Sequence, residues 1–106
     1  MEWETALERA RAVDKLYQDL DRERLGRIWS LPEFMAACST DWGELVENVL
    51  KREGIRPGES DEESLKHELG DLLWALIVIS DRLDIDLLES LDQTMGEIEE
   101  RFKYLA

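Results

Sequence analysis

The chain lacks the features that mark several classes of protein. Cys38 is its single cysteine, so no internal disulfide can form, which fits a reducing compartment. The longest apolar run covers residues 72–79, far short of the roughly 20 residues that a membrane-spanning helix needs. The amino-terminal segment is acidic and has no apolar stretch suited to a signal peptide. These absences predict one cytoplasmic domain, residues 1–106.

Positive charge is also scarce. There are 13 Lys and Arg against 26 Asp and Glu, which gives a net charge of −13. Such a surface repels nucleic-acid polymers and anionic membranes, so we expect neither as a direct partner. An anionic small ligand requires a bound cation or a local basic patch. The 43% hydrophobic content, with only 2 Pro and 6 Gly, argues against disorder.

Helical periodicity runs through almost the whole chain, and no segment alternates between apolar and polar residues. The pattern predicts helices over about residues 3–24, 31–53 and 61–83, and a fourth that starts near residues 84–86. Ser30, Pro32 and Glu33 are typical of a helix start. The last helix carries apolar residues at a and d spacing: Leu88, Leu91, Met95, Ile98, Phe102 and Leu105. We therefore predict an all-α, four-helix bundle-like domain with a central antiparallel hairpin.

The third helix is apolar on more than one face. One stripe runs from Leu65 to Leu83, and Trp74 and Ile77 make the opposite face apolar as well. A helix that is apolar all round must be covered all round. In a domain this small, this favours a homo-oligomer with Trp74 as an interface anchor. The alternative is that the first helix covers this face within one chain.

Two acidic pairs mirror each other across the predicted hairpin. Asp41 and Glu44 lie beside the apolar stripe of the second helix, and Glu68 and Asp71 lie at the same angular offsets on the third. The pairs Glu44/Glu68 and Asp41/Asp71 are both centred on position 56, inside the turn. All four carboxylates should therefore lie in one layer, at the border of the core.

No Lys or Arg stands three or four residues from any of these four carboxylates. Such a cluster must raise its pKa values or bind a cation, and an all-oxygen ligand set suits Mg²⁺, or Mn²⁺, rather than zinc. Gly43 and Gly70, one inside each pair, suggest close helix approach or space for a ligand. The alternative is an incidental layer in an acid-rich chain, and His67 is interpreted as a surface residue.

At these residues the sequence resembles the MazG-like, all-α nucleoside triphosphate pyrophosphohydrolases. The family's second motif, Glu-x-x-Asp, is present as Glu68 to Asp71, and the first has Asp41 in place of its usual leading Glu. The resemblance covers roughly residues 31–101. The Lys or Asn that family members commonly carry in the last helix is missing from residues 93–98.

The resemblance implies hydrolysis of a (deoxy)nucleoside triphosphate to the monophosphate and pyrophosphate, as nucleotide-pool housecleaning. The four carboxylates would hold Mg²⁺, Glu44 would act as the base, and the chain would form a homodimer or homotetramer. Candidate phosphate contacts are Lys51, Arg56, Lys66 and Arg101, and candidate base-stacking residues are Trp29 and Trp42. For each of them, an ordinary solvated or packed position is the alternative. A catalytically silent helical oligomer that binds a nucleotide or a protein, or a purely structural acidic bundle, remains an alternative for the whole chain.

Overall fold

Four α-helices make up the fold. The computed structural model describes residues 1–104, and no strand occurs among them. The all-α prediction is therefore confirmed, and Leu105 lies outside the described residues. No helix in this part of the chain is long and apolar enough to cross a membrane. The helices are α1 (Trp3–Leu25), α2 (Leu31–Arg52), α3 (Glu62–Arg82) and α4 (Leu87–Phe102).

The helix ends follow from local sequence. Gly26 ends α1 in the left-handed conformation, with φ 76°, where a side chain would be strained. Ser30 and Glu33 form the expected capping box at the start of α2. Asp61 and Asp86 cap α3 and α4 by accepting hydrogen bonds from backbone N–H groups of the first turn.

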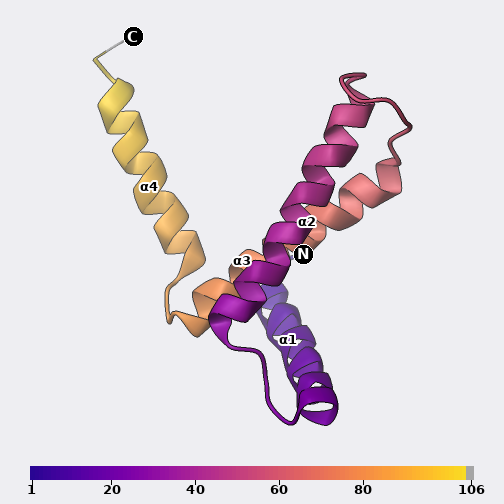
Figure 1. Cartoon of the computed structure of the whole chain (residues 1–106). Coiled ribbons are helices and arrows are strands. Elements are labelled where there is room, and N and C mark those ends of the chain that lie inside the picture. Colours follow the sequence, from indigo (N-terminus) through magenta and orange to yellow (C-terminus); the bar gives the residue numbers. More distant parts are fainter. Residues whose placement is uncertain (105–106) are drawn as a thin grey trace.

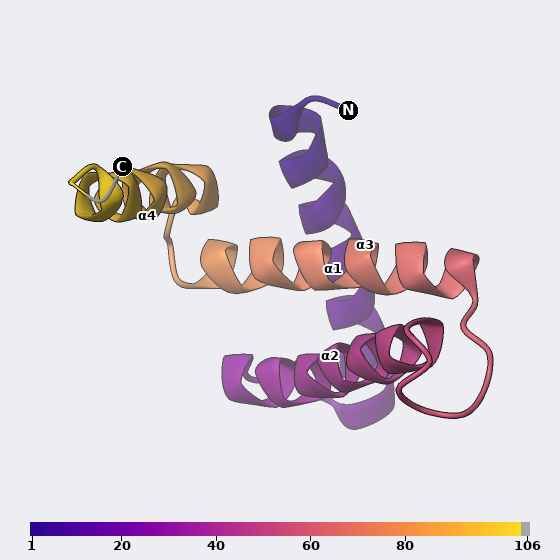
Figure 2. The same cartoon turned by 90° about the horizontal axis from the view of Figure 1, so that it is seen from above.

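The central element is the antiparallel hairpin of α2 and α3, joined by the turn at residues 53–61 (Figure 1). Leu45 and Leu65 are buried in its core. Helix α1 crosses α3 steeply on another face, as Figure 2 shows, and buries Ala10 there. The indole of Trp74 donates a hydrogen bond to the Ala10 carbonyl, 3.1 Å away. Trp74 therefore packs against α1 within the chain, which is the alternative to a role in a subunit interface.

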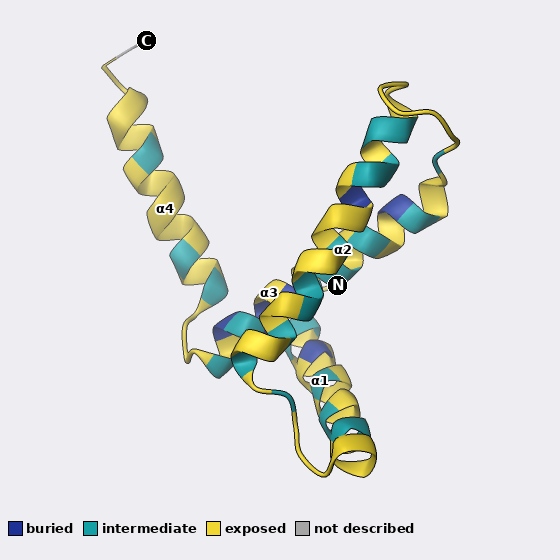
Figure 3. Cartoon of the chain, viewed as in Figure 1, coloured by how far each residue is buried: buried dark blue, intermediate teal, exposed yellow. Residues whose placement is uncertain are grey.

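The helices do not close around a single core. Among residues 1–104, α4 touches only α3, and none of its residues is buried (Figure 3). The radius of gyration is 17.2 Å, against about 13 Å for a compact domain of this length. The accessible surface is 8282 Å², about 2,000 Å² more than a compact monomer of this mass exposes. The isolated chain thus leaves much apolar surface uncovered.

The capping box makes the start of α2 sensitive to acid. The Arg27 guanidinium donates two hydrogen bonds to Glu33, and the Ser30 amide and hydroxyl donate two more, which lowers the pKa of Glu33 from 4.5 to about 2. Because the folded pKa is depressed, this stabilisation is fully present above pH 4.5 and is lost as the pH falls through about 2. We expect Glu33→Gln to flatten the dependence of the free energy of unfolding on pH between 2 and 5, measured by urea titration.

Glu99→Gln, a change at an exposed glutamate of α4, should leave that pH dependence as in the wild type. An unchanged slope in Glu33→Gln would show that the capping box contributes nothing to acid sensitivity.

Candidate active site

The four motif carboxylates surround one cavity between α2 and α3. The cavity has a volume of about 350 Å³. Asp41 and Glu44 come from the middle of α2, and Glu68 and Asp71 from the facing turns of α3. The mirrored spacing thus places all four where the antiparallel hairpin requires. The remaining lining residues are Asp61, Glu63, Ser64 and His67.

Neutral or weakly basic groups hold two of the carboxylates. The Asn48 amide donates to Glu68, 3.5 Å away, and Nε2 of His67 lies 3.1 Å from Asp71. His67 remains 78% exposed, so it is a surface residue that also orients a site carboxylate. In the described part of the chain no Lys or Arg forms an ion pair with any of the four.

The local field is negative on the core side as well. Burial raises the pKa of the Cys38 thiol, and the charges of Asp41 and Asp71 raise it further. The carboxylates of Asp41 on α2 and Asp71 on α3 thus both act on the same thiol.

The donor set fits a hard divalent cation in its chemistry. All four candidate ligands are carboxylates, which suit Mg²⁺ and Mn²⁺. Within residues 1–104, however, no three His, Cys, Asp or Glu side chains converge closely enough to share one ion. The carboxylates line the cavity wall instead, so cation binding requires their side chains to turn inward.

A neighbouring cavity of about 520 Å³ shares two of these carboxylates, Glu44 and Glu68. Lys51 lines it from the last turn of α2 and lies 3.8 Å from Glu47. Arg56 also pairs with Glu47, which is therefore a partly exposed carboxylate with two cationic partners. Among the four candidate phosphate contacts, Lys51 alone shares one of these described cavities with motif carboxylates.

The other two candidate phosphate contacts are Lys66 and Arg101. Lys66 is exposed on α3 and pairs with Glu63, 3.4 Å away, which itself lines the carboxylate cavity. Arg101 is in the last turn of α4, whose carboxyl end points away from the α2–α3 hairpin (Figure 1). Neither residue lines a cavity that contains a motif carboxylate.

An aromatic cleft of about 290 Å³ opens beside Asp41, between α1, α2 and α3. Trp29 lines it, whereas Trp42 is 60% exposed and does not. Trp74 forms part of the wall, with ring centroids 5.6 Å from both Tyr17 and Phe34. Asp41 borders both the cleft and the carboxylate cavity, so the two cavities are neighbours on either side of that residue.

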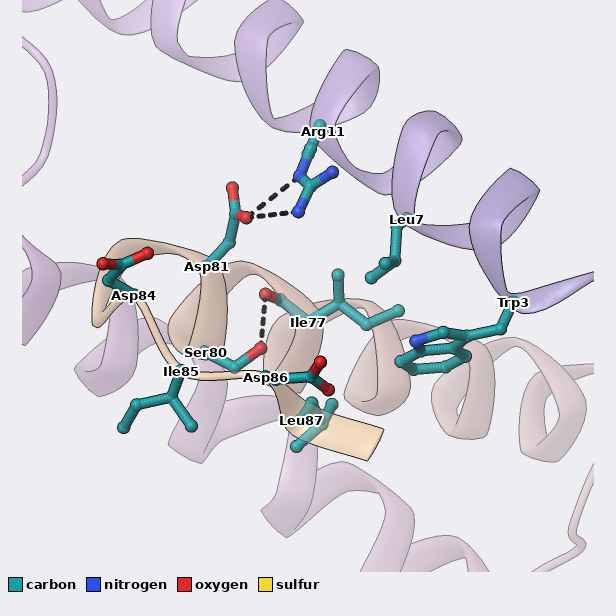
Figure 4. Close-up of a pocket in the computed structure, with 10 residues that line it drawn as sticks. All are labelled: Trp3, Leu7, Arg11, Ile77, Ser80, Asp81, Asp84, Ile85, Asp86 and Leu87. Atoms are coloured by element: carbon teal, nitrogen blue, oxygen red, sulfur yellow. Dashed lines mark hydrogen bonds and ion pairs between the residues drawn. The ribbon is translucent and has the colours of Figure 1, made fainter. Parts of the chain in front are cut away.

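A separate cavity of about 290 Å³ lies where α1 meets the carboxyl end of α3 (Figure 4). No motif carboxylate lines it. Arg11 binds one oxygen of Asp81 through two nitrogens, at 2.9 and 2.8 Å, and the apolar floor includes Leu7 and Ile77. This exposed ion pair joins α1 to α3 away from the candidate site.

The two glycines inside the acidic pairs do not serve close helix packing. A Cβ atom built on Gly43 or Gly70 would meet no other atom within 4 Å. The expectation of close helix approach was therefore wrong, because each glycine faces open space. The other expectation, space for a ligand, remains a prediction.

The fold and the paired acidic motifs can now be compared with known proteins. Residues 32–106 match the model of the MazG nucleotide pyrophosphohydrolase domain. The chain belongs to the MazG family. The MazG match covers α2, α3 and α4, and hence both acidic pairs.

Two comparisons with YpjD of Bacillus subtilis agree with the MazG assignment. The uncharacterized protein YpjD of strain 168 is 35% identical over 71 residues, which is 65% of this chain and 64% of YpjD. The chain thus spans somewhat less than two thirds of that relative in sequence. The crystal structure of YpjD, described as a proposed pyrophosphatase, matches with a TM-score of 0.59 at 27% identity. This structural match covers 83% of the present chain and 92% of the YpjD chain.

Sequence reasoning missed several residues of this site. Asn48 stands four residues after Glu44, and that spacing could have placed it on the same face. Arg24, Asp14 and Arg82 line the aromatic cleft. Because the last two are separated by more than sixty positions in the chain, no local pattern connects them.

Proposed function

We propose that the chain hydrolyses a (deoxy)nucleoside triphosphate to the monophosphate and pyrophosphate, with Mg²⁺ as its cofactor and Mn²⁺ as a substitute. The observation that carries this proposal is the cavity lined by carboxylates from two facing helices, without a Lys or Arg in its lining. Such a site is electrostatically unfavourable when empty and favourable for a cation. Membership of the MazG family supports the same reaction class.

In this mechanism Asp41, Glu44, Glu68 and Asp71 would hold the metal ion, which would supply positive charge for the phosphates and lower the pKa of a water. Glu44 lies at the junction of the two cavities, so it can accept the proton of the attacking water. The water oxygen forms a bond to the α-phosphorus. The bond between that phosphorus and the oxygen that bridges it to the β-phosphorus breaks, and pyrophosphate leaves.

Residues on the two sides of the carboxylates are suited to different parts of the substrate. Lys51 borders the carboxylates on one side, where an ammonium group can bind phosphate oxygens. On the other side the aromatic cleft, with Trp29 in its wall, offers apolar faces for a nucleobase. Arg24, which makes no ion pair within the described residues, lines the same cleft and supplies a second cation.

A second copy of the chain completes the fold in this proposal. The side of the hairpin away from the carboxylates exposes two apolar stripes, because about 100° separates successive residues on each helix. The stripes consist of Met35, Trp42, Val46 and Val49 on α2, and Leu69, Leu73 and Leu76 on α3. The excess surface of about 2,000 Å² is of the size that an obligate homodimer buries, and pairing of dimers would give the homotetramer.

The test is a panel assay with separate detection of pyrophosphate, orthophosphate and monophosphate. We expect at least one ribo- or deoxynucleoside triphosphate to yield pyrophosphate and monophosphate in equal amounts with Mg²⁺ or Mn²⁺. EDTA should abolish the reaction, because the carboxylates alone cannot neutralise the phosphates. Release of orthophosphate alone, or no turnover of any triphosphate, would contradict the proposal.

A second candidate function follows from α4. Residues 93–98 contain no Lys or Asn, and Arg101 is in the last turn of α4. A site without a phosphate contact from α4 can bind a nucleotide and leave it intact. In the panel, stabilisation by a triphosphate and metal without pyrophosphate release would identify this silent binder.

A further inference from the structure

One nearly buried ion pair stands at the wall of the aromatic cleft. Nη2 of Arg82, the last residue of α3, lies 2.8 Å from a carboxylate oxygen of Asp14 in α1. Their side chains are 19% and 13% exposed, far less than those of the Arg11–Asp81 pair, at 53% and 40%. The pair joins two helices that are distant in sequence, and both of its members line the cleft.

The same guanidinium fixes two further parts of the wall. Its Nη1 donates to the Trp29 carbonyl, 3.3 Å away, and its central carbon lies 5.3 Å from the Phe34 ring centroid. On the other side of the pair, Gln18 donates to the second oxygen of Asp14, at 3.0 Å. One side chain therefore ties the connection before α2 to α1, α2 and α3.

Stability alone is a weak explanation for this arrangement. A desolvated ion pair roughly balances its Coulomb attraction against its desolvation cost, and apolar residues of similar volume stabilise a core as well or better. Nε of Arg82 is moreover buried without a hydrogen-bond partner in the described part of the chain, which adds a cost. What the planar guanidinium provides, and apolar packing does not, is a fixed relative position for two polar groups, the Asp14 carboxylate and the Trp29 carbonyl.

We propose that Arg82 is a positioning residue that preforms the cleft for the nucleobase by holding Asp14 and the Trp29 backbone. The inference deepens the proposed function, because it assigns the cleft beside Asp41 to the base. Two of the parts that Arg82 holds, Asp14 and Trp29, precede the residues 32–106 that match the MazG domain. Base binding thus depends on a wall that this chain builds ahead of its MazG region.

The physical consequence concerns binding cost. A wall that is already ordered need not be immobilised when the ligand arrives, and each side chain that is spared this ordering strengthens binding by up to roughly tenfold. Arg82→Lys keeps the charge but cannot reach Asp14 and the Trp29 carbonyl in the same planar geometry. It is also the mildest change to the ion pair, so the variant should fold.

The test compares a ligand that has a base with one that has none. The non-hydrolysable α,β-imido analogues of dTTP and dATP, and inorganic tripolyphosphate, are titrated calorimetrically into the full chain with Mg²⁺. We expect Arg82→Lys and Asp14→Asn each to weaken at least one nucleotide analogue by roughly tenfold, and tripolyphosphate by less than about twofold. The double variant should bind the nucleotide analogue about as weakly as either single variant, because both substitutions break the same Arg82–Asp14 ion pair.

Arg11→Gln is the matched control. It breaks the other ion pair between α1 and α3, which lines a different cavity. We expect it to leave the binding of all three ligands unchanged. Equal weakening of the nucleotides and tripolyphosphate in Arg82→Lys would reveal a general structural role and overturn the inference, as would unchanged nucleotide binding.

The two proposals fail in different ways. Binding of a nucleotide that depends on Arg82, without turnover of any triphosphate, would uphold the cleft and overturn the hydrolase. Turnover in the panel with no effect of Arg82→Lys on nucleotide affinity would do the reverse. If the wild type binds tripolyphosphate, and binds neither nucleotide analogue more tightly than tripolyphosphate, the cleft has no role in base binding and the inference is overturned.

Discussion

Pyrophosphate release by Glu68→Gln should fall by about 100-fold or more relative to the wild type. Glu68 borders both the carboxylate cavity and the neighbouring cavity of Lys51, and Asn48 holds its carboxylate. Glutamine keeps the size of the side chain and removes its charge. The variant should therefore fold normally and lose cation affinity, which initial rates over a range of Mg²⁺ concentrations would measure.

Glu47→Gln is the control for this effect. Glu47 lies one turn beyond Glu44 on α2, but it pairs with Lys51 and Arg56 and does not line the carboxylate cavity. Its exposed ion pairs contribute little, so a change of less than about threefold is expected. Equal losses in Glu47→Gln and Glu68→Gln would point to a general effect of surface charge and contradict the assignment.

Leu76→Glu should separate the proposed homodimer into monomers. Leu76 is 52% exposed in the single chain and lies in the apolar stripe of α3. A glutamate there must lose its hydration when the stripe is covered. With one unpaired carboxylate from each copy, we expect the dissociation constant to rise by roughly 100-fold or more. Light scattering after size exclusion, at several protein concentrations, would measure it.

Leu16→Glu provides the comparison, since Leu16 is 67% exposed on α1 and lies outside these stripes. Its mass in solution should match that of the wild type. A monomeric wild type, or a Leu76→Glu variant that stays dimeric at low micromolar concentration, would show that the hairpin stripes do not form the interface.

The carboxylate cavity could be predicted because both determinants are local. The i, i+3 spacing fixes Asp41 with Glu44 and Glu68 with Asp71, and a short turn makes their helices antiparallel neighbours. The helix ends were predictable for the same reason, as the capping box at Ser30 shows.

The aromatic cleft could not be predicted, because it depends on which face of α3 receives α1. Trp74 illustrates this: its apolar surroundings in sequence allow either a subunit interface or contact with α1. The hydrogen bond to Ala10 and the contacts with Tyr17 and Phe34 show which contacts it makes within the chain. The position of α4 could not be predicted either. Its apolar stripe indicates packing against the other helices, but in the single chain that stripe remains largely exposed.

The most direct test of the account is a titration of the chain with Mn²⁺, in which electron paramagnetic resonance measures the free ion. The account predicts saturable binding in the wild type, displacement by Mg²⁺, and loss of binding in Glu68→Gln but not in Glu47→Gln. Unchanged Mn²⁺ binding in Glu68→Gln, or no binding by the wild type at millimolar Mn²⁺, would contradict a metal site at these four carboxylates.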